Sequence, residues 1–268
     1  MFNAPRRAKC LDNGIARRAT PRTASDRAYF GRNRPASFKK NEVKPWHRRQ
    51  WCIRELHADF VYHMEDILDL YAEPFDPHCP VVCFDELPYQ LVGDWIEPLF
   101  PQPGRGYRED YTYERQGICN FFMIFHPLAG WRHVKITEQR TALDYAQCLK
   151  DIVQVHFPTA RCIRLVQDNL NTHTRANLYE AFPPEEARQL IKKLEPHYTP
   201  KHARWLNMAE TEFSVLSRQC PPRRFPDRAH LEHYVTTWEH DRNAKKVTVN
   251  WTFTISQARK KMKRAYPV

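Results

Sequence analysis

The chain has 268 residues, of which 42% are hydrophobic, which is enough for one large domain with an appendage. No segment approaches the roughly 18 consecutive apolar residues of a membrane helix, and the N-terminus lacks the apolar region of a secretory signal. These features exclude a helical membrane protein and a secreted one, and predict an intracellular protein with no membrane partner. The eight cysteines include one close pair, Cys79 and Cys83. A structural zinc site would need two such clusters, so buried reduced thiols are the preferred interpretation.

The formal net charge of +11 is unevenly distributed. Residues 1–50 hold 14 Lys and Arg against 3 Asp and Glu, whereas residues 51–268 hold 28 of each sign. We therefore expect a basic N-terminal arm over residues 1–50 and a neutral folded domain over residues 51–268. A basic arm on a neutral body is typical of nucleic-acid binding, although a solvated, disordered tail fits the composition equally well.

Within the arm, residues 1–37 show no apolar period and are expected to be mostly disordered. Residues 38–51 interleave basic and aromatic side chains, which suits contacts with the DNA backbone. A linker packed onto the body through Trp46 and Trp51 explains this segment equally well. The candidate DNA-binding residues of the arm are Lys39, Lys40, Lys44, Arg48 and Arg49.

The rest of the chain alternates between helical and strand-like segments. The expected strands are 80–86, 117–125, 131–137, 161–167 and 197–200, the second and third forming a hairpin. Residues 87–115, rich in Pro, Trp and Tyr, are expected to be an irregular but ordered insertion around a turn at 101–106. Amphipathic spacing predicts helices over 55–71, 141–157, 174–182, 184–194, 206–218, 231–242 and 255–265. This order predicts an α/β fold, a mixed sheet flanked by helices.

Carboxylates end two of the strands. Asp85 follows the buried run of 80–84, Asp168 follows the strand 161–167, and Glu210 lies in the helix 206–218. Two strand ends and one helix can bring these groups together at the open end of a sheet. Three such carboxylates stay ionised together only if a cation neutralises them, and hard oxygen ligands suit Mg²⁺ or Mn²⁺. Two such ions support phosphoryl transfer, and the basic arm suggests that the phosphate belongs to nucleic acid.

Three sequence motifs resemble those of a known protein family. They are residues 82–86 (VCFDE), 168–173 (DNLNTH) and 198–210 (YTPKHARWLNMAE). From about residue 38 to the end, the chain resembles bacterial insertion-sequence transposases of the mariner-type superfamily, which have a ribonuclease-H-like DDE catalytic core. The resemblance implies that Asp85, Asp168 and Glu210 are the catalytic residues and ligands of two Mg²⁺ or Mn²⁺ ions. It also implies a DNA endonuclease and strand transferase that acts on double-stranded transposon ends as a homodimer in the bacterial cytoplasm, at the nucleoid when bound.

The chain departs from that family at its N-terminus. The family carries helix-turn-helix DNA-binding modules before the core, and no such pattern precedes residue 51. A truncated or frameshifted copy is therefore expected, with impaired transposition. Two alternatives remain open: a decayed or repurposed DNA-binding protein without transposition activity, and a generic ribonuclease-H-like nuclease.

Each candidate has a competitor or a supporting role. Glu86 competes with Asp85, and Glu212 competes with Glu210. The rival roles of the two aspartates are structural: strand-end capping for Asp85 and helix capping for Asp168. Glu86, Asn169, His173 and Asn207 are candidates for positioning the catalytic groups or the substrate, although His173 fits a packed histidine equally well. Lys201, His202 and Arg204 precede the Glu210 helix and are candidate DNA contacts, against a plain surface loop.

Overall fold

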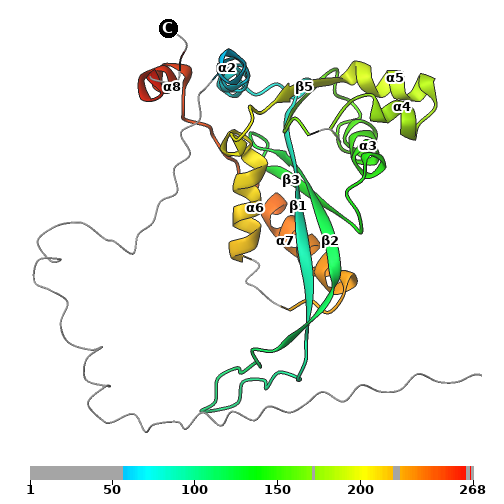
Figure 1. The fold of residues 1–268 in the computed structure, drawn as a ribbon, viewed down its shortest axis with the longest axis vertical. Coiled ribbons are helices and arrows are strands. Elements are labelled where there is room, and N and C mark those ends of the chain that lie inside the picture. The colour runs from blue at the N-terminus through cyan, green and yellow to red at the C-terminus, as the bar shows by residue number, and fades with distance from the viewer. Residues whose placement is uncertain (1–56, 171–172, 220–223, 264–265, 267–268) are drawn as a thin grey trace, which may run out of the picture. The chain divides into compact units, whose positions relative to one another are not determined.

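The fold is built around a five-stranded mixed sheet. The computed structural model describes residues 57–170, 173–219, 224–263 and 266, all within the unit 54–268. The strand order is β3-β2-β1-β4-β5 (Figure 1). Antiparallel pairing joins β1 to β2 and β2 to β3, and parallel pairing joins β1 to β4 and β4 to β5. The bounds are β1 Val81–Asp94, β2 Tyr113–His126, β3 Trp131–Thr137, β4 Ile163–Gln167 and β5 Leu194–Tyr198.

Helices cover both faces of this sheet (Figure 1). One face packs against α2 (Ala58–Ala72), α6 (Met208–Gln219) and α7 (Arg228–Ala244), and α8 (Ile255–Lys261) joins the same core. The other face packs against α3 (Ala142–Asp151), α4 (Asn177–Ala181) and α5 (Pro184–Lys193). This arrangement confirms the predicted α/β class. Within the described ranges, no helix is long and apolar enough to cross a membrane.

Strand periodicity explains the two cores. On β2, Phe121, Met123 and Phe125 enter the core under α6 and α7, whereas Phe122 and Ile124 enter the core under α3. Successive side chains of a strand point to opposite faces, so a strand buried on both sides reads as a continuous apolar run. That is why residues 118–125 show almost no polar interruption.

Residues 87–115 were expected to be an irregular insertion, and this is wrong for the residues at both ends of that range, which lie in strands. The strand β1 continues through Asp94 and pairs with β2 from Tyr113, so the two form a long hairpin that projects beyond the helices (Figure 1). The prolines suggested a break. However, β4 pairs only with Val81–Cys83 of β1, and an edge free of a partner tolerates the missing N–H of Pro88. Asp85 therefore lies within a strand and not at its end.

The remaining elements follow the prediction with shifted bounds. The expected helix 141–157 is α3 followed by a π-helical turn, η1 (Ile152–His156). A capping box fixes its start, because the Thr141 hydroxyl accepts from the Asp144 N–H while the Asp144 side chain accepts from the Thr141 N–H. The five cysteines in the described ranges are free, and Cys83, Cys119 and Cys148 are buried.

Candidate active site

Glu210 is placed beside Asp85 by the way α6 begins. Asn207 donates from Nδ2 to the Phe84 carbonyl (2.8 Å), and its Oδ1 accepts from the Ala209 N–H (3.1 Å). The same side chain thus ties the first turn of α6 to the β1 backbone next to Asp85. Asp85 is 2% exposed and Glu210 is half-buried in that first turn.

The electrostatics of Asp85 reflect this crowding. Burial raises the pKa of Asp85 well above its usual range, and the neighbouring carboxylate of Glu210 raises it further. A hydrogen bond from the Glu86 N–H (2.9 Å) and the charge of Arg204 oppose the rise. Two carboxylates this close compete for the same neutralising charge.

Arg204 is the cation that Asp85 and Glu210 share. Its Nε lies 2.5 Å from Glu210 Oε1, and one terminal nitrogen lies 3.8 Å from Asp85 Oδ2. Partial burial lowers the pKa of Arg204, but Asp85, Glu210 and Asp168 together raise it above its usual value. The structure therefore brings Asp85 and Glu210 to one guanidinium, and the charge of Asp168 acts on it without an ion pair.

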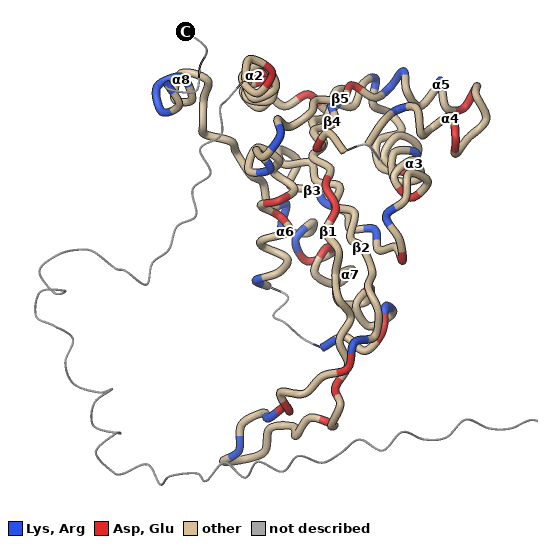
Figure 2. The backbone as a smooth tube through the Cα atoms, in the orientation of Figure 1, with Lys and Arg blue, Asp and Glu red and all other residues tan. Residues whose placement is uncertain are grey.

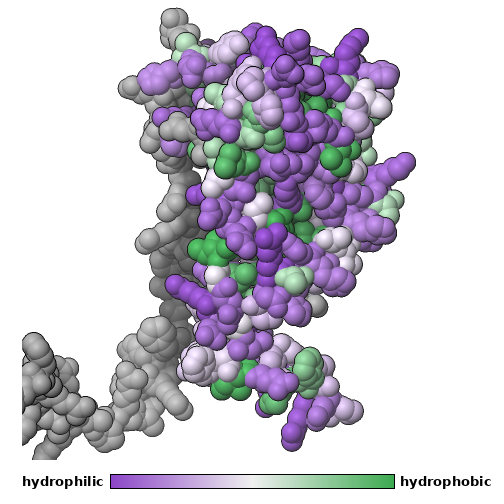
Figure 3. All heavy atoms as spheres, turned by 90° about the vertical axis from the view of Figure 1, so that its right-hand side faces the viewer, coloured by the Kyte–Doolittle hydropathy of each residue, from purple (hydrophilic) through white to green (hydrophobic). Residues whose placement is uncertain are grey.

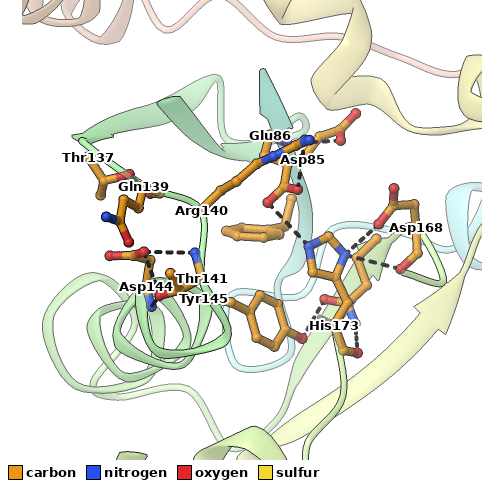
Figure 4. A network of polar contacts seen from close by, with 12 residues as sticks. Asp85, Glu86, Thr137, Gln139, Arg140, Thr141, Asp144, Tyr145, Asp168 and His173 are labelled. Carbon is orange, nitrogen blue, oxygen red and sulfur yellow. Dashed lines mark hydrogen bonds and ion pairs between the residues drawn. The ribbon is translucent and has the colours of Figure 1, made fainter. Parts of the chain in front are cut away.

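Asp168 is held from its other side by His173. The imidazole Nδ1 is ion-paired with Asp168 Oδ1, and Nε2 lies 3.4 Å from Glu86 Oε2. Figure 4 shows Glu86 and Asp168 facing the ring from opposite sides, with Arg140 on the far side of Glu86. Arg140 Nη1 lies 3.6 Å from Glu86 Oε1. Burial by itself would lower the pKa of His173, but the two carboxylates outweigh it and raise the pKa to about 9. The ring is therefore a buried cation between two acids at neutral pH.

A second layer of contacts fixes the His173 ring. It stacks on Tyr145 of α3, with centroids 4.7 Å apart. The Tyr145 hydroxyl donates to Gln167 Oε1 (2.9 Å), and Gln167 Nε2 donates to the His173 carbonyl (3.3 Å). Asp168 consequently follows a fully buried Gln167 and faces an imidazole that cannot turn freely.

The competing carboxylates point elsewhere. Because successive side chains of β1 alternate, Glu86 faces the α3 side of the sheet, whereas Asp85 faces α6 and Glu210. Glu212 is fully buried and ion-paired with Arg132 of β3 (3.0 Å) and Arg242 of α7 (2.7 Å). This placement favours Asp85 and Glu210 over their competitors as members of one cluster.

The other predicted site residues are spread more widely. Lys39, Lys40, Lys44, Arg48 and Arg49 lie outside the described residues. Asn169 is exposed, and Lys201 and His202 are exposed in the turn before η2 (Arg204–Leu206), where His202 has φ 67°. Sequence reasoning missed Arg140, Tyr145 and Gln167. Their types and spacing carry no signal, because only the folded sheet brings Tyr145 and Gln167 to His173 and Arg140 to Glu86.

The donor set suits a hard divalent cation. Within the described ranges, no three acidic, imidazole or thiol side chains already surround a common metal position; Arg204 lies between Asp85 and Glu210. Carboxylate oxygens are nevertheless the ligands that Mg²⁺ and Mn²⁺ prefer. Burial is the main cause of the raised pKa of Asp85, and the charge of Glu210 adds to it; a bound cation would favour the ionised form of both.

Comparison with solved structures gives the same fold. A Mos1 transposase paired-end complex with the left transposon end is 14% identical, with a TM-score of 0.52, over 78% of this chain and 63% of that one. The Mos1 strand transfer complex is 13% identical with a TM-score of 0.54 over the same shares, and a Mos1 mariner paired-end complex with Mn is 15% identical with a TM-score of 0.51, over 78% and 64%. The chain thus spans about 63% of the length of these relatives.

Comparison by sequence identifies the family. No curated protein matches the chain. Residues 80–232 match the model of the DDE superfamily endonuclease, and they include Asp85, Asp168 and Glu210. Since this match covers more than half of the 268 residues, the chain belongs to the DDE superfamily endonucleases.

Proposed function

We propose that this chain is a transposase catalytic domain that cuts DNA at transposon ends and joins the freed ends to target DNA. The observation that carries the proposal is that Asp85 and Glu210 meet at Arg204, whose pKa the charge of Asp168 also raises. Three strand- and helix-borne carboxylates beside one exposed cation suit a phosphodiester, because they can hold metal ions while the cation contacts phosphate.

The cofactor of this proposal is a pair of Mg²⁺ or Mn²⁺ ions. When bound, they supply an activated nucleophile and stabilise the leaving oxygen. Asp85, Asp168 and Glu210 would hold them, and the Mos1 complex solved with Mn supports divalent metal use in this fold. His173 and Glu86 keep the Asp168 carboxylate oriented, and Asn207 keeps Glu210 next to Asp85.

Double-stranded DNA is the proposed substrate. The side chain of Arg204 is 60% exposed although its guanidinium touches the carboxylates. Lys201 and His202 are exposed in the preceding turn. These groups can contact the phosphates on either side of the scissile bond, and the basic residues 1–50 add sequence-independent affinity. A bacterial nucleoid in the cytoplasm is the setting we propose for this substrate.

A homodimer is the proposed working form, because two transposon ends must be held together. The segment that joins β1 to β2 exposes several large apolar side chains, and Figure 3 shows a few hydrophobic residues at that end of the molecule among hydrophilic ones. Exposed apolar patches of this kind mark protein interfaces. The residues are Trp95, Ile96, Leu99, Phe100, Tyr107 and Tyr111.

Replacing Asp168 with Asn tests the proposed chemistry. The change keeps the side-chain shape but removes a charged metal ligand, so Mg²⁺-dependent nicking of transposon-end duplex should fall at least a hundredfold. Binding of the same duplex in EDTA should stay within about threefold, because phosphate contacts carry the affinity. Nicking is measured on labelled oligonucleotides and binding by fluorescence anisotropy.

The control is Asp69→Asn, which removes an exposed carboxylate of α2 and should leave nicking unchanged. Full nicking by the Asp168→Asn variant would remove Asp168 from the catalytic group. Metal-independent DNA binding without any nicking by the wild type would favour the alternative of a DNA-binding protein that has lost its chemistry.

A further inference from the structure

Three aromatic rings form a column beside Arg204. Trp205 follows Arg204 directly and stacks on Trp251, with centroids 6.2 Å apart and an interplanar angle of 19°. Trp251 in turn contacts Tyr71 of α2 at 5.2 Å. The Tyr71 hydroxyl donates to the Leu206 carbonyl (2.8 Å), so the inner end of the column is tied to the segment that carries its outer ring.

The outer ring of this column is left partly uncovered. Tyr71 and Trp251 pack against the core, whereas Trp205 is 45% exposed. Leaving so much of an indole in water forgoes hydrophobic stabilisation, so packing alone does not explain a tryptophan there. A flat, rigidly backed and exposed ring is suited to stacking against another planar group.

Cations are linked to the exposed indole in two ways, through the chain and through Phe253. Arg204 contacts Glu210 at one end. At the other end Phe253 lies 5.8 Å from the Trp205 ring, and Lys261 Nζ lies 5.3 Å from the Phe253 ring. Lys260 and Lys261 are exposed on α8, whose basic positions are visible in Figure 2. We call Arg204, Trp205, Phe253, Lys260 and Lys261 the aromatic strip; it runs from the candidate carboxylates to α8.

We infer that the aromatic strip binds single-stranded DNA, with an unpaired base stacked on Trp205 and the phosphates on Lys260 and Lys261. Exposed aromatic rings between cations are the usual means of holding single strands, because every base has a π-face. An intact duplex keeps its bases stacked inside and offers none to the indole. The inference rests on the proposed function for one point only. That point is the source of the unpaired bases, which arise where a strand is cut next to Arg204 and Glu210.

The test measures binding of a fluorescein-labelled dT20 oligonucleotide to the full, metal-free chain by anisotropy. Trp205→Leu keeps apolar contact with Trp251 but removes the ring, and should weaken binding roughly tenfold. Trp205→Phe retains a ring and should stay within about threefold of the wild type. The matched control is Tyr179→Leu on α4, which removes an aromatic side chain of the same 45% exposure and should have no effect.

Two further measurements make the result independent of whether Trp205→Leu folds. On the wild type, 2-aminopurine inside the oligonucleotide should be quenched on binding, since stacking on an indole quenches it. Lys261→Gln should lower the slope of log K against log[salt] by about 0.7, the value for one phosphate contact on a single strand. Failure of the wild type to bind dT20, binding without quenching, or equal losses in Trp205→Leu and Tyr179→Leu would each overturn the inference.

Because the assay contains no metal, it separates this inference from the proposed function. Binding of dT20 with the expected Trp205 dependence, but no nicking activity in Mg²⁺, would retain the strip and reject the transposase chemistry. If the wild type nicks DNA normally but the Trp205→Leu variant binds dT20 as tightly as the wild type, the role of the aromatic strip is rejected and the transposase chemistry is retained.

Discussion

His126 shows how a single buried residue links stability to pH. It is 4% exposed and lies between Phe75 and Phe157, with ring centroids 5.6 and 5.9 Å away. Burial lowers the pKa of His126 to about 4, partly opposed by a hydrogen bond with the Val81 backbone. The ring is therefore neutral in the native state over a pH range in which an unfolded chain, with a pKa of about 6.5, is protonated.

The sign of the effect follows from this difference. Above pH 6.5 the contribution to stability is complete; it is lost as the pH falls through the window from about 6.5 to 4, because only the unfolded state takes up the proton. The expected loss for this residue is roughly 3 kcal/mol. His126→Gln, which does not titrate, should flatten that part of the curve when urea unfolding is measured from pH 8 to 4. An identical pH dependence in both proteins would contradict the assignment.

At the scale of elements, a buried charge cluster joins three of them. Glu212 of α6 bonds both Arg132 of β3 and Arg242 of α7, and all three side chains are almost completely buried. Removing one partner from such a cluster leaves uncompensated buried charge. The cluster therefore holds α6, and with it Glu210, at a fixed place on the sheet.

Glu212→Gln should lower the free energy of unfolding by about 3 kcal/mol, because two buried guanidinium groups lose their counter-ion. Asp241→Asn is the control. It breaks the exposed pair between Asp241 of α7 and Lys245, the residue after this helix, and should cost less than about 1 kcal/mol. Urea denaturation, monitored by circular dichroism, measures the free energy of unfolding of both variants. Equal losses in the two variants would show that the buried cluster stabilises the fold no more than an exposed ion pair does.

The same elements show what the sequence could predict. Apolar runs and alternation located β3 and most helices, because burial leaves a regular pattern. The length of β1 could not be predicted, since Pro88 suggested a break and only the short reach of β4 makes it tolerable. The opposite orientations of Asp85 and Glu86 follow from strand alternation, so that signal was present. The central position of Arg204 was not, because it depends on how α6 docks beside β1.

At the scale of the whole molecule, the β1–β2 hairpin carries apolar side chains that nothing within one chain covers among the described residues. Leu99 and Phe100 are 66% and 71% exposed in the segment that joins β1 to β2. Replacing both with Ser should raise the dimer dissociation constant at least tenfold, since apolar area would no longer be buried between chains. The fold should be unaffected because neither side chain packs against the core.

The control for this dimer prediction replaces two side chains of similar exposure outside the hairpin. Tyr62 on α2 and Val155 in η1 are 67% and 66% exposed, and their double replacement by Ser should leave association unchanged. Sedimentation equilibrium of the three proteins, with and without a DNA carrying two ends, gives the constants. If the wild type stays monomeric on that DNA, or if both double variants associate as the wild type does, then the hairpin is not the contact between chains. A monomer on that DNA would mean that each chain holds its end alone, whereas unchanged association of both variants would place the contact between chains on another surface.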